Sequence, residues 1–172
     1  MWPDIDGLAP EEVIASTAVA TEPSGERVSR FAVAMAAAGA GFVDVAPLHV
    51  MTTATLRRLA ELDPESTFDV RRYRPNFLLD VDGDGFVEND WVGRVVRIGA
   101  VALRVTIPTM RCVMTTLAQP GLGAERSTLR TIAAHNRVEI PGLGTWACAG
   151  SYADVVAPGP VRVGDEVVVT GA

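Results

Sequence analysis

Short apolar segments rich in β-branched residues dominate the chain after residue 75. Glycine, aspartate and proline separate them, a pattern that predicts strands joined by turns. We expect strands at residues 76–81, 91–98, 101–107 and 161–170. Gly99 lies between two of these segments, so residues 95–107 are expected to form a β-hairpin.

Helical spacing is confined to a few short stretches. Thr52 or Thr53 is a suitable N-cap for a helix that carries Leu56, Leu59 and Leu62 and ends before the next proline. The leucines recur every three residues, so they are expected to share one face.

Two further helices are predicted, one in the first 45 residues and one after residue 126. The later one starts at Ser127 and presents Leu129, Ile132 and Ala133 to the core. The earlier one is the alanine-rich stretch at residues 32–38, which glycine follows. Many short strands with few helices predict a β-rich α+β fold, a β-barrel with a few short helices.

Length and composition bound the class of protein. With 172 residues and 48% hydrophobic content, the chain can bury one core, and we expect a main domain at residues 45–172. Residues 1–44 are an N-terminal extension or part of that domain. An acidic N-terminus without a signal peptide, two cysteines and no membrane-spanning run predict a cytoplasmic protein.

The charged residues limit the classes of ligand that the chain is expected to bind. All 15 basic residues are arginine, so the chain has no lysine with which to hold pyridoxal phosphate covalently. The net charge of −6 disfavours nucleic acid as a partner, because binding to its phosphates needs a basic surface. A small anionic molecule gripped by a few arginines is compatible with this composition.

The segment at residues 109–116 concentrates reactive groups. It places the thiol of Cys112 beside the guanidinium of Arg111 and among hydroxyl side chains. A neighbouring positive charge lowers a thiol pKa from its usual value of about 8.5 and favours the thiolate, which attacks sulfur or binds a metal. Taken alone, however, a cysteine among apolar residues is more often a small buried core residue, and Cys148 has no adjacent charge.

A cluster of arginines precedes the first predicted strand. Three arginines at residues 71–74 stand before Pro75, which is expected to hold Arg74 extended, and Asn76 follows. This cluster could fix an anion or a heterocycle, since Asn76 offers both a donor and an acceptor. The alternative is a solvated strand edge protected by charge.

Other motifs favour structural interpretations. The acidic segment at residues 80–88 resembles half of a calcium-binding loop, but its twelfth position is Trp91 in place of glutamate, so an acidic turn is favoured. His49 and His135 lack the spacing of a zinc site. No Gly-x-Ser-x-Gly elbow of a serine hydrolase occurs.

Several segments, taken in order, resemble MOSC domains. These domains occur at the C-termini of molybdenum cofactor sulfurases, in amidoxime-reducing molybdenum enzymes and as small stand-alone bacterial proteins. The likeness spans about residues 45–170, with residues 48–56 as a weaker block. Its main segments are Arg72-Tyr-Arg-Pro-Asn-Phe, Trp91-Val-Gly, the run from Pro108 to Thr116, and the Pro-Gly-x-Val-x-Val-Gly-Asp ending at residues 158–165.

The resemblance implies a MOSC-type β-barrel with Cys112 at its functional centre. In the reductases the matching cysteine ligates molybdenum, and elsewhere in the family it is proposed to carry a persulfide. The same matching implies that Arg74, Asn76, Thr109 and Arg111 contact the pterin or phosphate of molybdenum cofactor.

Two functions follow from the resemblance. The first is a molybdenum-dependent oxidoreductase component that reduces N-oxygenated or similar small molecules and is fed by an electron-donor protein. The second is a sulfur carrier that Cys112 would load from a cysteine desulfurase. A binding module without catalysis is a third alternative. The reductases carry another β-barrel domain before this one, so a partner or a homodimer could complete the site here.

Overall fold

The computed structural model describes residues 19–21, 27–29 and 45–171 of the chain. The helix expected at residues 32–38, and most of the N-terminal extension, lie outside the described residues. Strands dominate the rest, as expected, and the two α-helices of the described part are α2 (Thr53–Leu62) and α3 (Ser127–His135). Neither of them is long and apolar enough to cross a membrane.

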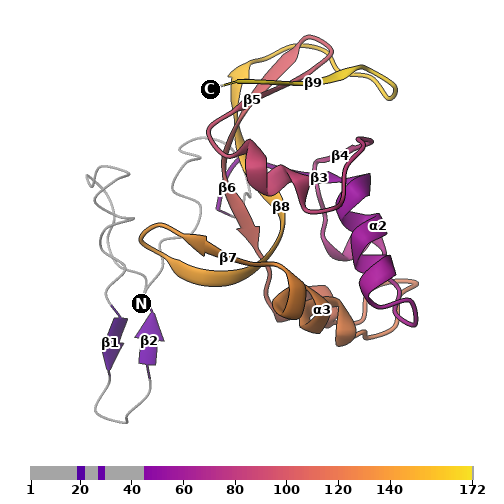
Figure 1. Ribbon diagram of the computed structural model, residues 1–172, viewed down its shortest axis with the longest axis vertical. Helices are drawn as coiled ribbons and strands as arrows, with labels where there is room; N and C mark the ends of the chain where they lie inside the picture. The colour runs from indigo at the N-terminus through magenta and orange to yellow at the C-terminus, as the bar shows by residue number, and fades with distance from the viewer. Residues whose placement is uncertain (1–18, 22–26, 30–44, 172) are drawn as a thin grey trace.

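Seven strands form one strongly curved sheet, a half-barrel that occupies the centre of Figure 1. Their order is β4-β3-β8-β6-β5-β9, with β7 paired to a further part of β8. The strands are β3 (Leu48–Thr52), β4 (Phe77–Leu79), β5 (Val95–Ile98), β6 (Val101–Met110), β7 (Arg137–Ile140), β8 (Gly144–Ala157) and β9 (Val167–Thr170). A separate antiparallel pair joins β1 (Val19–Thr21) to β2 (Arg27–Ser29).

The long strand β8 organises the sheet because it pairs with three neighbours, β3, β6 and β7. It was not among the strands expected from the sequence. Glycine, alanine and serine in its middle weaken the strand pattern, and Gly150 there has a φ of 81°. Partners distant in sequence therefore fix this strand more than local propensity does.

The expected hairpin is confirmed. β5 and β6 pair antiparallel from Ile98 opposite Val101 to Val95 opposite Arg104, and Gly99 takes a positive φ of 55° in the turn. Three expected strands are shorter than predicted, and of residues 76–81 only those of β4 form a strand. Residues 87–91 form a 3-10 helix, η3 (Val87–Trp91), before β5, and residues 161–166 lie outside β9.

Helix α2 begins where the sequence predicts. Thr52 is its N-cap, with the side-chain hydroxyl accepting from the Thr55 amide. The Thr52 and Thr55 hydroxyls both donate to the carboxylate of Glu88, a fully buried residue of η3. A carboxylate at this position also faces the positive end of the α2 dipole, so η3 and α2 are linked inside the core.

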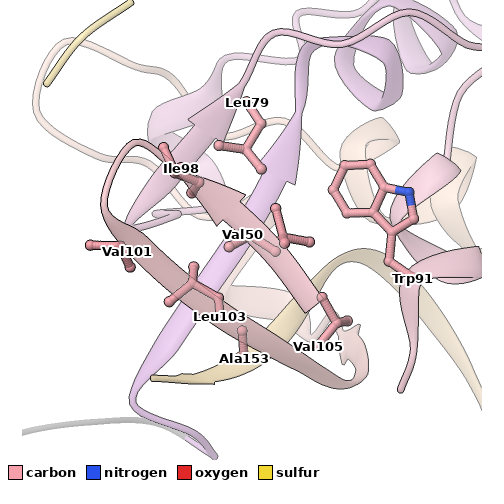
Figure 2. Packing of buried hydrophobic residues seen from close by; sticks show 9 residues of the cluster. Val50, Leu79, Trp91, Ile98, Val101, Leu103, Val105 and Ala153 are labelled. Carbon is pink, nitrogen blue, oxygen red and sulfur yellow. The ribbon is translucent and has the colours of Figure 1, made fainter. Parts of the chain in front are cut away.

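Two apolar clusters fill the interior. The first lies within the curve of the sheet, where Figure 2 shows Leu103 and Val105 of β6 beside Val50 of β3 and Trp91. The second packs the helices against β3 and β8, and Ile132 of α3 is fully buried in it. Leu129 and Ala133, also expected in the core, are only half-buried. Both clusters include a residue of β3, Val50 in the first and Met51 in the second.

Candidate functional site

The two cysteines occupy opposite environments. Cys112 is exposed and follows β6 as the N-cap of the short helix η4 (Val113–Thr116), whereas Cys148 is fully buried in β8. Burial raises the pKa of the Cys148 thiol to about 11. Of these two free thiols, Cys112 is therefore the one that a ligand or reagent can reach.

Hydrogen bonds hold the backbone on both sides of Cys112. The Arg111 amide donates to the Ala147 carbonyl at 2.8 Å, which continues the pairing of β6 with β8. The Cys112 carbonyl accepts from the Thr115 amide at 3.3 Å and from its hydroxyl at 3.1 Å. The thiol thus stands at a fixed turn between a strand and a 3-10 helix.

Apolar side chains that follow Cys112 along the chain are exposed at the surface. Val113 and Met114 are each 59% exposed, and Leu117 is 44% exposed. Trp146 of β8 is 44% exposed as well, and its indole N–H donates to the Leu143 carbonyl at 2.7 Å. Nothing in the sequence pattern pointed to Trp146, because β8 itself was missed.

The Arg111 guanidinium turns inward from this turn. Its Nε donates to the Ala149 carbonyl at 2.8 Å, and one terminal nitrogen donates to the Tyr73 carbonyl at 3.2 Å. The other terminal nitrogen contacts Ala149 and the His49 ring, and the group lies 5.5 Å from the centre of the Tyr73 ring. Burial lowers the pKa of Arg111 to about 10, so it stays charged at neutral pH.

Thr109 and Tyr73 add polar atoms to the interior near Arg111. The Thr109 side chain is 1% exposed, and its Oγ1 has no hydrogen-bond partner among the described residues. The Tyr73 hydroxyl is likewise buried without one, and burial raises its pKa. Orphaned buried polar atoms cost free energy and often mark a place where a ligand or water binds.

Arg74 and Asn76 are both exposed, at the start of β4. Asn76 exchanges two hydrogen bonds of 2.8 Å with the backbone of His49, one through its side-chain Oδ1 and one through its amide. The expectation that Pro75 holds Arg74 extended is wrong, because Arg74 has a φ of 52°. Its amide bonds the Val70 carbonyl and ends the 3-10 helix η2 (Val70–Arg72) in the left-handed conformation typical of helix ends.

The arginine cluster is divided between three roles. Arg72 is buried and donates to carbonyls of residues 115, 117 and 123, so it supports the loop that follows η4. Arg71 pairs with Asp69 at the surface. Arg74 has an exposed side chain, and it is the member of the cluster best placed to meet an anion.

The acidic loop joins β4 to η3, with bends at residues 83–85 and its last two residues in η3. Arg57 of α2 donates to the Val81 carbonyl at 3.1 Å and lies 3.9 Å from the Asp80 carboxylate. A guanidinium at this loop competes with a cation for its oxygens. Among the described residues, no group of three or more histidine, cysteine or acidic side chains is arranged to hold a metal ion.

Comparisons with known proteins give one family match and one similar solved structure. The family model for the MOSC domain matches residues 39–168, which is most of the chain. Among solved structures, YiiM from Geobacillus stearothermophilus is similar at 15% identity with a TM-score of 0.48, covering 72% of this chain and 54% of that one. The chain thus spans about half the length of that protein. No curated protein sequence matches. From the extent of the family match, the chain belongs to the MOSC domain family.

Proposed function

We propose that this MOSC domain protein binds molybdenum cofactor through the thiolate of Cys112 and serves as an oxidoreductase component that reduces N-oxygenated or similar small molecules. The observation that carries the proposal is the accessible thiol of Cys112, fixed at a turn by hydrogen bonds on both sides. A soft thiolate suits molybdenum in an oxo and dithiolene shell.

We assign the expected site residues roles in holding such a group. Cys112 would be the protein's ligand to the metal, and Arg74 and Asn76, both exposed, would contact the pterin or its phosphate. Thr109 and Arg111 are turned inward, so we assign them places behind the thiol, where Thr109 offers an orphaned hydroxyl.

In this proposal the cofactor and the protein residues have separate roles. When bound, molybdenum cofactor supplies two-electron redox chemistry, with electrons from a separate donor protein. The chain's own residues bind and orient: Cys112 ligates, and Arg74 neutralises phosphate charge. The exposed apolar side chains of Val113 and Met114 offer contact to an apolar part of a substrate.

A sulfur carrier is the second candidate, and the exposure of Cys112 among apolar residues on an outer surface favours it too. The Cys112 thiolate would attack the outer sulfur of a desulfurase persulfide. The S–S bond of the donor would break, the donor thiolate would leave, and Cys112 would keep the sulfur as a persulfide.

Two measurements on purified protein separate these functions. For the first, protein made with a molybdate supply should show a visible absorption band that disappears in Cys112→Ala and persists in Cys148→Ala. For the second, mass spectrometry after incubation with a desulfurase and cysteine should show the mass of one added sulfur on Cys112. An absorption spectrum identical in wild type and Cys112→Ala would contradict the leading proposal.

A further inference from the structure

We infer that His49 is a positioning residue of the candidate site, whose neutral imidazole accepts a hydrogen bond from Arg111 and fixes the segment that ends in Cys112. The inference rests on the proposed function only in taking Cys112 as the working residue. From the sequence, His49 was considered only as a zinc ligand, although it lies in the weaker family-like block at residues 48–56.

The backbone of His49 is held firmly in β3. The His49 amide donates to Asn76 Oδ1, and the His49 carbonyl accepts from the Asn76 amide, each at 2.8 Å. On the other side, His49 stands opposite Tyr152 of β8, with the two rings 6.1 Å apart at an angle of 60°. His49 is only 7% exposed, and its backbone position is fixed by these contacts.

Space for the imidazole comes from Gly150. A Cβ at this position would collide with His49 Nε2 and lie 2.7 Å from the Val50 carbonyl, and its φ of 81° is one that glycine adopts readily. Any side chain at residue 150 would displace the ring from Arg111. Gly150 and His49 are thus matched across the β3–β8 pair.

The partners of the ring define its protonation state. Nε2 faces a terminal nitrogen of Arg111, and a guanidinium can only donate, so Nε2 must offer a lone pair and Nδ1 carries the proton. Burial first, and the Arg111 charge second, lower the pKa of His49 to about 3, although hydrogen bonds that the ring donates to the backbone of Arg74 and Ala149 oppose this. We assign the neutral Nδ1–H tautomer.

This arrangement links the two segments that carry the expected site residues. Asn76 fixes the His49 backbone, the His49 ring hydrogen-bonds the Arg74 backbone and contacts the Arg111 guanidinium, and Arg111 precedes Cys112. Residues separated by about one third of the chain are thus joined through one buried imidazole. A substitution at His49 should therefore alter the backbone at Cys112 through Arg111, without direct contact between the two residues.

The first test reads the tautomer in the wild-type chain. A long-range proton–nitrogen correlation spectrum near neutral pH should show His49 with a protonated Nδ1 and a bare Nε2, the His135 signals being identified from the His135→Gln variant. A protonated Nε2, or a charged ring, would overturn the inference.

The second test measures amide hydrogen exchange at Arg111 in two variants. Glutamine supplies one acceptor and a donor, so His49→Gln should exchange as wild type does, whereas His49→Phe should exchange about fivefold faster, as expected for one lost hydrogen bond. His135→Phe is the matched control at an exposed histidine and should change nothing.

Equal exchange in wild type and a folded His49→Phe, or equally fast exchange in both His49 variants, would refute the positioning role. If His49→Phe does not fold, the tautomer of the wild type and the amide exchange of His49→Gln test the positioning role. Neither measurement depends on molybdenum, so a protein that takes up no molybdenum would remove the proposed function and leave this inference intact.

Discussion

At the scale of single residues, the surroundings of each thiol set its chemistry. Cys112 is exposed at a turn, and Cys148 is buried with a pKa raised to about 11. In the sequence, the charged Arg111 precedes Cys112, and this neighbour predicts a reactive thiol. The structure adds that the charge itself, on Arg111, points into the protein.

Alkylation should distinguish the two cysteines. Iodoacetamide at mildly alkaline pH is expected to modify one thiol of the folded chain, because the protein covers Cys148. Mass spectrometry of intact protein should show a single adduct in wild type and Cys148→Ser, and none in Cys112→Ser at the same exposure time. A rapid second adduct on the folded wild type would show that Cys148 is accessible.

His49 should make stability depend on pH. Its pKa is about 3 when folded against 6.5 ordinarily, so between these values the unfolded chain binds a proton that the folded chain does not. Stability is then greatest above the ordinary value and falls on acidification by up to about 1.4 kcal/mol per pH unit.

Urea denaturation at about pH 7, 6 and 5 measures this slope. His49→Gln has no titrating ring at this position and should show a shallower dependence, with the carboxylates contributing equally in both proteins. Parallel pH profiles for wild type and variant would contradict the assignment of a buried neutral histidine.

At the scale of secondary-structure elements, local signals predicted what local interactions determine. Helix α2 starts at the Thr52 cap and ends before Pro64, as its sequence indicated. The β5–β6 hairpin follows its glycine. Strand β8 was not predicted because its partners lie up to about 100 residues away and the residues in its middle are small. The structural role of Arg72 was not predicted for the same reason, because its guanidinium donates to carbonyls of a loop distant in sequence.

The N-terminus of α2 offers a matched pair of variants. Thr52→Ala removes a helix cap and one of the hydroxyls that bond the buried Glu88 carboxylate, so it should lower the free energy of unfolding by about 2 kcal/mol. Thr53→Ala removes an exposed bond to Asp80 and should cost at most about 0.5 kcal/mol. Equal losses in denaturant titrations would argue against the buried network.

At the scale of the whole molecule, the half-barrel brings together what the chain separates. The resemblance predicted the fold class and the family, and both are confirmed. The site residues remain predictions. Of these, Cys112, Arg74 and Asn76 are exposed, while Thr109 and Arg111 are turned inward. The pairing of β6 with β8, including its register shifts, joins segments about 50 residues apart, which no local pattern encodes.

The central claim is that Cys112 holds the metal of a molybdenum cofactor. Its most direct test is the molybdenum content of the full chain, purified from cells supplied with molybdate, in wild type, Cys148→Ala and Cys112→Ala. The account predicts molybdenum stoichiometric with protein in the first two and background levels in Cys112→Ala. Equal molybdenum in all three, or none in wild type, would contradict it.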